Sequence, residues 1–166
     1  MNISQDGLVV RPEKGAKYSV VGDLVTFKAV GEDTGGKYAL FEIVFEPQIS
    51  TPPHIHSRED ESFYILEGEM EFQLDEQTVV ATPGTFIHSP KGQRHSFKNT
   101  STTAQTKMLC WAIPSGIEHY FAEVGTRVED ACTSAPPINP AAIEIVVTTA
   151  PKYGIQIIPP AANSVK

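Results

Sequence analysis

The stretch "PPHIHSREDESFYILEGEMEF", residues 52–72, places His54 and His56 two positions apart, just ahead of an acidic cluster. Its last residues alternate, with Met70 and Phe72 separated by a single glutamate. Because side chains alternate between the two faces of a β-strand, residues two apart point to the same side. One strand can therefore direct both histidines toward one point. The stretch predicts a metal site on a β-structure, and the alternative is a solvated turn that carries histidines.

The sequence around this stretch favours an all-β fold. Residues 23–30 and 37–45 are rich in Val, Ile, Phe and Tyr and flank the turn-forming cluster "GEDTGG", and residues 106–113 form the last strong strand. Short strands punctuated by Gly and Pro at about ten-residue spacing are typical of a double-sheet barrel of the jelly-roll type. The residues expected to face its interior are Ala39, Phe41, Ile43, Phe45, Met70, Phe72 and Leu74.

The character of the sequence changes after Pro114. Residues 117–124, "IEHYFAEV", fit a short amphipathic helix that Gly125 ends. Asn139 and the proline after it could cap a second helix. We therefore expect a single barrel domain over residues 1–125 and a C-terminal arm with a possible short helix over residues 126–166.

Composition sets limits on the class of protein. The chain has 166 residues, of which 40% are hydrophobic and 20% charged, as in an ordinary globular domain. The net charge of −7 argues against nucleic acid or an anionic membrane as the main partner. No apolar run reaches the roughly 18 residues of a membrane span, and the first residues do not resemble a signal peptide. We expect a cytoplasmic protein with Cys110 and Cys132 reduced, and Cys110 in the core.

The histidines and the acidic cluster supply the ligand types of a divalent first-row metal. Imidazole nitrogens and carboxylate oxygens suit Mn, Fe, Co, Ni, Cu and Zn. Glu61 follows the His54/His56 pair across a bend, and His95 opens a later strand, so both are candidate additional ligands. A site with few protein ligands keeps open coordination positions for chemistry.

Two spaced motifs resemble those of the cupin superfamily. Residues 54–68 read H-x-H-x4-E-x6-G, like the first cupin motif, and residues 84–99 read G-x5-P-x-G-x2-H-x3-N, like the second. The resemblance covers roughly residues 40 to 113. It implies a cupin barrel in which His54, His56, Glu61 and His95 bind one divalent metal whose identity the sequence does not give.

Three details qualify this resemblance. The first motif usually begins with glycine, and Gln48 stands there, which puts the local backbone geometry in question. Asp60 fits a shorter allowed spacing for the carboxylate, but Glu61 keeps the step to the motif's final glycine and is preferred. His88 either lines the barrel or sits in its wall, and we expect His119 to be exposed.

The segments flanking the motifs resemble small single-barrel cupins related to quercetin 2,3-dioxygenase. That resemblance implies a dioxygenase for a flavonol-like or other enolic aromatic substrate, with dioxygen as co-substrate, Glu61 as the catalytic base and a homodimeric assembly. Alternatives are a different cupin enzyme, of the oxalate or isomerase type, and a non-catalytic small-molecule-binding barrel. An anionic substrate would favour an inward Lys or Arg, and the sequence offers no convincing one.

Overall fold

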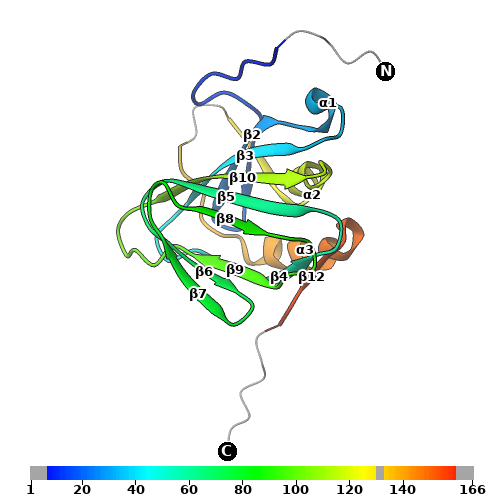
Figure 1. Cartoon of the computed structure of the whole chain (residues 1–166). Coiled ribbons are helices and arrows are strands. Elements are labelled where there is room, and N and C mark those ends of the chain that lie inside the picture. The colour runs from blue at the N-terminus through cyan, green and yellow to red at the C-terminus, as the bar shows by residue number, and fades with distance from the viewer. Residues whose placement is uncertain (1–6, 130–132, 160–166) are drawn as a thin grey trace, which may run out of the picture.

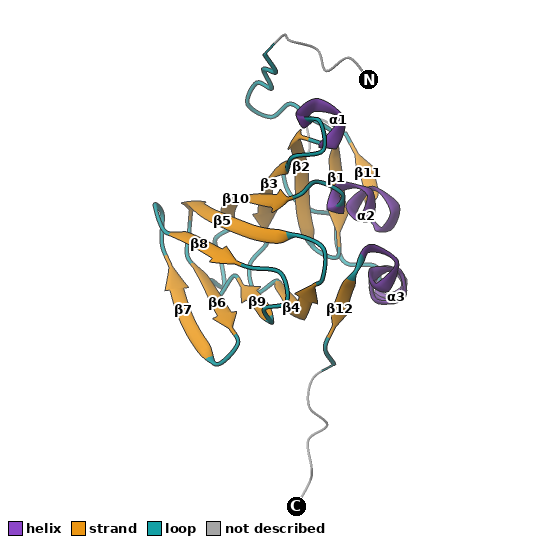
Figure 2. Cartoon of the chain, turned by 45° about the vertical axis from the view of Figure 1, so that its right-hand side comes forward, coloured by secondary structure: helices purple, strands orange, loops and turns teal. Residues whose placement is uncertain are grey.

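Two antiparallel β-sheets face each other in the computed structural model of the chain, which describes residues 7–129 and 133–159 (Figures 1 and 2). The larger sheet has seven strands in the order β11-β1-β2-β3-β10-β5-β8. Their bounds in that order are Thr126–Val128, Lys17–Val20, Asp23–Ala29, Ala39–Phe45, Thr106–Ile113, Asp60–Glu67 and Phe86–Ser89. The smaller sheet has five strands in the order β12-β4-β9-β6-β7. Their bounds are Ile155–Ile157, Ser50–His56, His95–Lys98, Met70–Leu74 and Gln77–Ala81. The predicted all-β jelly-roll architecture is confirmed.

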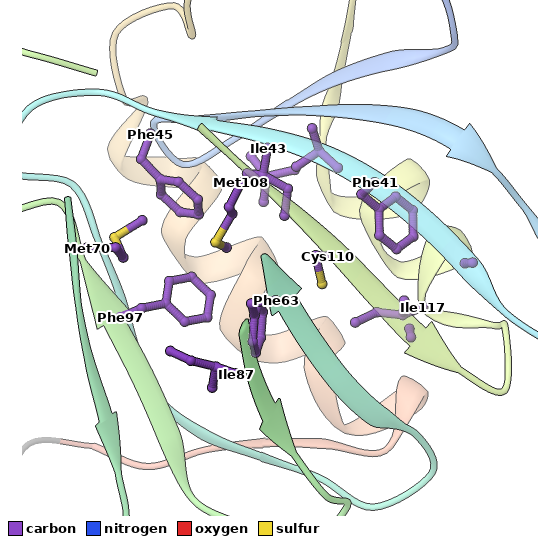
Figure 3. Packing of buried hydrophobic residues seen from close by; sticks show 14 of the residues in the cluster. Phe41, Ile43, Phe45, Phe63, Met70, Ile87, Phe97, Met108, Cys110 and Ile117 are labelled. Atoms are coloured by element: carbon purple, nitrogen blue, oxygen red, sulfur yellow. The ribbon is translucent and has the colours of Figure 1, made fainter. Parts of the chain in front are cut away.

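The core lies between the sheets, where period-two alternation aims apolar side chains inward (Figure 3). Phe97 of the smaller sheet makes edge contacts with Phe45 and Phe63 of the larger one, with ring centroids 5.5 and 5.4 Å apart. Each fully buried aromatic of this kind contributes about 1.5–3 kcal/mol to folding. Six of the seven residues predicted to face inward are confirmed as buried, namely Ala39, Phe41, Ile43, Phe45, Met70 and Phe72. The seventh, Leu74, is partly buried and packs against the core.

The helices gather at one end of the sheets (Figure 2). Helix α2 spans Ile117–Val124, and α3 spans Pro140–Thr149 with the Asn139 side chain accepting a hydrogen bond from Ala141 N. Both predicted helices are thus confirmed, including the Asn139 cap. A 3₁₀ turn, η1 (Ala150–Tyr153), follows α3. The "GEDTGG" cluster was expected to be a plain turn, and it holds the short helix α1 (Gly31–Thr34), whose Gly31 N donates to Glu118.

Residues expected to form a C-terminal arm contribute to both sheets. Strand β11 adds an edge to the larger sheet by pairing with β1, and β12 pairs with β4 in the smaller one. Cys132 lies outside the described residues, so its state stays a prediction. Among the helices that are described, none is long and apolar enough to cross a membrane.

Gln48, which stands where the first cupin motif usually has glycine, adopts a left-handed backbone conformation. Its φ is +64°, in the left-handed region where glycine is normally found. Its side-chain amide donates to the carbonyl oxygens of Thr100 and Ser101, at 2.7 and 2.9 Å. The two hydrogen bonds stabilise this conformation and offset the strain that a non-glycine residue has there.

Candidate metal centre

Four side chains from three strands converge between the sheets. His54 and His56 project from β4, and His95 of β9 pairs directly opposite His54. Glu61 reaches the same point from β5 of the facing sheet. All four are buried, and one potential ligand atom from each lies within 4.8 Å of the others. The structure therefore brings together all four residues that the sequence singled out.

The outer ring nitrogens of the three histidines are all engaged. His54 Nδ1 lies 2.8 Å from the Pro52 carbonyl, and His56 Nδ1 lies 2.8 Å from Glu59 Oε1. His95 Nδ1 lies 3.2 Å from the Gln93 carbonyl and 3.0 Å from the Ser89 hydroxyl. Carbonyls and carboxylates only accept, so each Nδ1 carries the proton. In a neutral ring that keeps its proton on Nδ1, Nε2 is the nitrogen that can bind a metal.

Glu61 sits between these nitrogens. Its Oε2 lies 3.1 Å from His56 Nε2 and 2.9 Å from His95 Nε2. The Cys110 thiol lies 3.7 Å from the other oxygen and donates toward it. Burial favours the neutral acid, but His56 and His95 outweigh it and lower the pKa of Glu61 to about 2. The side chain is therefore a carboxylate at neutral pH.

The histidines differ in how readily they take up a proton. Burial, followed by the neighbouring His95 and His56, lowers the pKa of His54 to about 3. Burial also opposes charge on His56, but Glu61 and Glu59 prevail and raise its pKa. His54 is thus held neutral, the form that binds metals.

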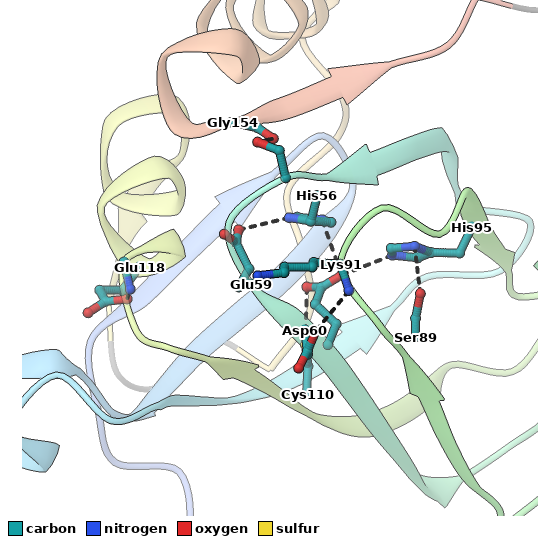
Figure 4. A network of polar contacts seen from close by, with 12 residues as sticks. His56, Glu59, Asp60, Ser89, Lys91, His95, Cys110, Glu118 and Gly154 are labelled. Atoms are coloured by element: carbon teal, nitrogen blue, oxygen red, sulfur yellow. Dashed lines mark hydrogen bonds and ion pairs between the residues drawn. The ribbon is translucent and has the colours of Figure 1, made fainter.

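The donor set fits a divalent first-row metal. Three imidazole Nε2 atoms and one carboxylate oxygen are the ligand types that such ions accept, and each imidazole is oriented by a hydrogen bond on its far side. Asp60 takes no part, because its carboxylate accepts from the backbone N–H of Lys91 (Figure 4). The carboxylate that the sequence preferred, Glu61, is the one in the cluster.

Several supporting residues were missed from the sequence. Glu59 and Ser89 are buried and orient His56 and His95 (Figure 4). The place of Glu59 three residues after His56 is the signal in the sequence that could have suggested this role. Cys110 is buried as predicted, and it also contacts Glu61.

The remaining histidines lie apart from the cluster. His88 is exposed and contacts the Ser62 hydroxyl through Nδ1 at 3.0 Å, so it belongs to the wall. His119 is exposed on α2, as expected. Neither ring belongs to the four-residue group.

An apolar cavity of about 150 Å³ opens beside the cluster. Strands of both sheets form its walls, and α2, α3 and β12 close one side of it. His54, His56 and Glu61 lie on its surface together with Phe45, Phe63 and other apolar side chains. Of the described residues that line it, none is Lys or Arg, in agreement with the sequence-based expectation.

Comparison with known proteins agrees with this geometry. Residues 41–112 match the family model for the cupin domain, Cupin_2. The chain contains a cupin domain. Its match to quercetin 2,3-dioxygenase of Bacillus subtilis is 36% identical over 76 residues, which are 46% of this chain. The aligned segment spans only 22% of that enzyme.

Solved structures have a similar fold. KdgF from a Halomonas species superposes with a TM-score of 0.60 at 16% identity, over 69% of this chain and 99% of that one. A predicted oxalate decarboxylase from Thermotoga maritima gives a TM-score of 0.58 at 24% identity, over 64% and 98% of the two chains. At such identities these likenesses establish the fold alone.

Proposed function

We propose that this cupin is a metal-dependent dioxygenase for an enolic aromatic small molecule. The observation that carries the proposal is the set of three imidazole Nε2 atoms gathered around the Glu61 carboxylate. His54, His56 and Glu61 of this set lie at the surface of an apolar cavity that has no Lys or Arg among its described lining residues. Such a cavity suits a flat, neutral ring system.

The chain's own residues have separate tasks in this reaction. His54, His56, Glu61 and His95 would hold the metal, which supplies a place where the enolate oxygen and dioxygen meet. Glu61, ionised by its imidazole neighbours, accepts the proton of the enol hydroxyl. The apolar walls exclude water while both oxygen atoms enter the ring-opened product.

The partial match to quercetin 2,3-dioxygenase supports this substrate class. Oxalate-type chemistry is less favoured, because a small dianion in this cavity would lack a Lys or Arg partner among the described lining residues. The same argument applies to an isomerase that acts on an anionic sugar. A non-catalytic binding barrel would have the same cavity, and it would differ from the proposed enzyme only in that it does not turn over its ligand.

The test combines metal analysis with oxygen consumption. Protein purified without chelators or a nickel column is analysed for metals, then loaded separately with Mn, Fe, Co, Ni, Cu and Zn. Oxygen uptake is followed with quercetin. We expect about one metal ion per chain and oxygen consumption when that ion is redox-active. The variant His95→Ala should lose both. Quercetin binding without oxygen uptake, under all these metals, would favour the binding barrel instead.

A further inference from the structure

The cavity contains an acidic side chain that the metal centre does not use. Asp23 opens strand β2 and lines the cavity together with Val25, as expected for residues two apart on one strand. The adjacent Gly22 packs close to Ile49, which precedes β4. From Ser50 to His56, β4 extends roughly 20 Å by the usual rise per residue. Asp23 therefore lies toward the end of the cavity remote from the histidine cluster.

One oxygen of the half-buried Asp23 side chain lacks the partners that the buried acids have. Its Oδ1 is buried and has no hydrogen-bond partner within the described structure. Buried Glu118, by contrast, accepts from the backbone N–H groups of Gly31 and Gly116 at 2.8 and 2.6 Å. Glu59 and Glu61 are engaged by histidines. A buried polar atom without a partner is costly, so native structures seldom keep one without a use.

The charge state of Asp23 agrees with a hydrogen-bonding role. Burial raises the pKa of its carboxyl well above the usual value. A neutral carboxylic acid can donate through its hydroxyl and accept through its carbonyl oxygen. The wall around it is apolar, so a ligand oxygen that arrived there would meet little competition from water.

The turn that presents Asp23 is strained. Val21 and Gly22 connect β1 to β2 with φ values of +46° and +92°. A β-branched residue in this region is rare, because its Cβ crowds the backbone. Val21 also lines the cavity. Strained positions of this kind tend to occur at ligand sites.

We propose that Asp23 is a ligand-recognition residue, which binds a hydroxyl or carbonyl oxygen at the end of the substrate remote from the metal centre. The cavity would then take an elongated, mainly apolar molecule with an oxygen at each end, one for the metal centre and one for Asp23. The inference rests on the proposed function only in treating this cavity as the substrate site.

The test uses phenol and toluene, which have similar shapes and differ by a hydroxyl and a methyl group. Their dissociation constants are measured by NMR titration of the full-length wild-type chain and of Asp23→Leu, after chelation and again after metal loading. We expect the preference for phenol over toluene to fall about five- to tenfold in Asp23→Leu, as for loss of one hydrogen bond. The fall should be equal with and without metal.

Two further variants define the outcome. Asp23→Asn keeps polar groups at the site and should retain most of the preference, while Asp60→Asn alters an acid outside the cavity and should retain all of it. An infrared band of a protonated carboxylic acid, present in the wild type and absent in Asp23→Asn, is expected as well. An unchanged preference in Asp23→Leu, or no binding of either probe to the wild type, overturns the inference. The binding measurements do not depend on oxygen consumption by the protein. A negative result for the dioxygenase proposal therefore leaves the proposal on Asp23 intact, and the two can be refuted separately.

Discussion

His56 is held by two carboxylates that act on opposite sides of one ring. Glu59 accepts from Nδ1, and Glu61 approaches Nε2. The first contact fixes the ring orientation and the tautomer, and it makes Nε2 more basic as a ligand. Glu59 is buried, so water cannot easily replace it. It therefore supports the candidate metal centre through His56, and it is not one of the four residues of the cluster.

Replacing Glu59 tests this role. In Glu59→Ala the His56 ring loses its partner, and we expect metal affinity to fall by about 10- to 100-fold, as is usual when such outer hydrogen bonds are removed. Titration with a competing chelator measures the change. The neighbouring variant Asp60→Asn is the control and should bind metal like the wild type. Equal affinities in Glu59→Ala and the wild type would contradict the role.

Gln48 stabilises its turn through its side chain. We therefore predict that alanine and glycine at this position differ in their effect on stability. Gln48→Ala keeps the left-handed backbone strain but loses both hydrogen bonds to the 100–101 carbonyls, so we expect a loss of about 1–3 kcal/mol in unfolding free energy. Gln48→Gly loses the same bonds and relieves the strain, so it should be less destabilised than the alanine variant. Urea denaturation of both variants gives the order. A glycine variant less stable than the alanine variant would show that the left-handed backbone at this position carries no strain for glycine to relieve.

At the scale of elements, the sequence predicted what alternation and turn residues encode. Strand β6 and the histidine pair on β4 follow a period of two, so the sequence alone was enough to assign their faces. Strands β11 and β12 could not be predicted, because each has three residues and forms only by pairing with an edge already in place. The contact between Glu59 and His56 depends also on the bend between β4 and β5, which their three-residue spacing does not specify by itself.

Helix α3 covers the cavity with few contacts of its own. None of its residues is fully buried, yet Ile143, Val146 and Val147 line the cavity. The Asn139 side chain caps the helix's own first turn, and the Tyr120 hydroxyl of α2 donates to the Val146 carbonyl at 2.9 Å. Such an element is expected to open locally more often than the sheets do.

Removing the cap should increase that opening. In Asn139→Ala, we expect amide hydrogen exchange in α3 to accelerate by roughly fivefold, the equivalent of about 1 kcal/mol for a lost N-cap. Exchange in β5 and β10 should stay the same. Thr148→Ala serves as control, because the Thr148 hydroxyl bonds only within the helix and alanine favours helices. Faster exchange throughout both sheets would mean that α3 unfolds only with the whole domain.

At the scale of the whole molecule, the candidate metal centre lies between the two sheets and takes residues from both. The histidines belong to the smaller sheet and Glu61 to the larger one, so a bound ion would link them directly. We expect free metal at about 100 times its dissociation constant to raise the unfolding free energy by about 2.7 kcal/mol. Thermal or urea unfolding with and without metal measures this. His95→Ala should lose the increment and keep its fold, and an equal increment in that variant would place the ion elsewhere.

Asp23 should make the stability of the domain depend on pH. Its pKa is raised in the folded state, so the folded chain holds a proton that the unfolded chain releases above pH about 4. Its contribution is therefore fully present below that pH and is lost as pH rises toward the folded pKa.

We thus expect Asp23→Leu to gain stability relative to the wild type as pH rises from about 4 to 8, with a slope of at most about 1.4 kcal/mol per pH unit. Urea denaturation of both proteins across this range measures the difference, in which effects of the other titrating groups largely cancel. A difference that does not change with pH would mean that Asp23 titrates alike in the folded and unfolded chains. If the stability of Asp23→Leu relative to the wild type rises with pH, then Asp23 lowers the stability of the domain at neutral pH. Such a cost is expected of a residue that serves ligand binding.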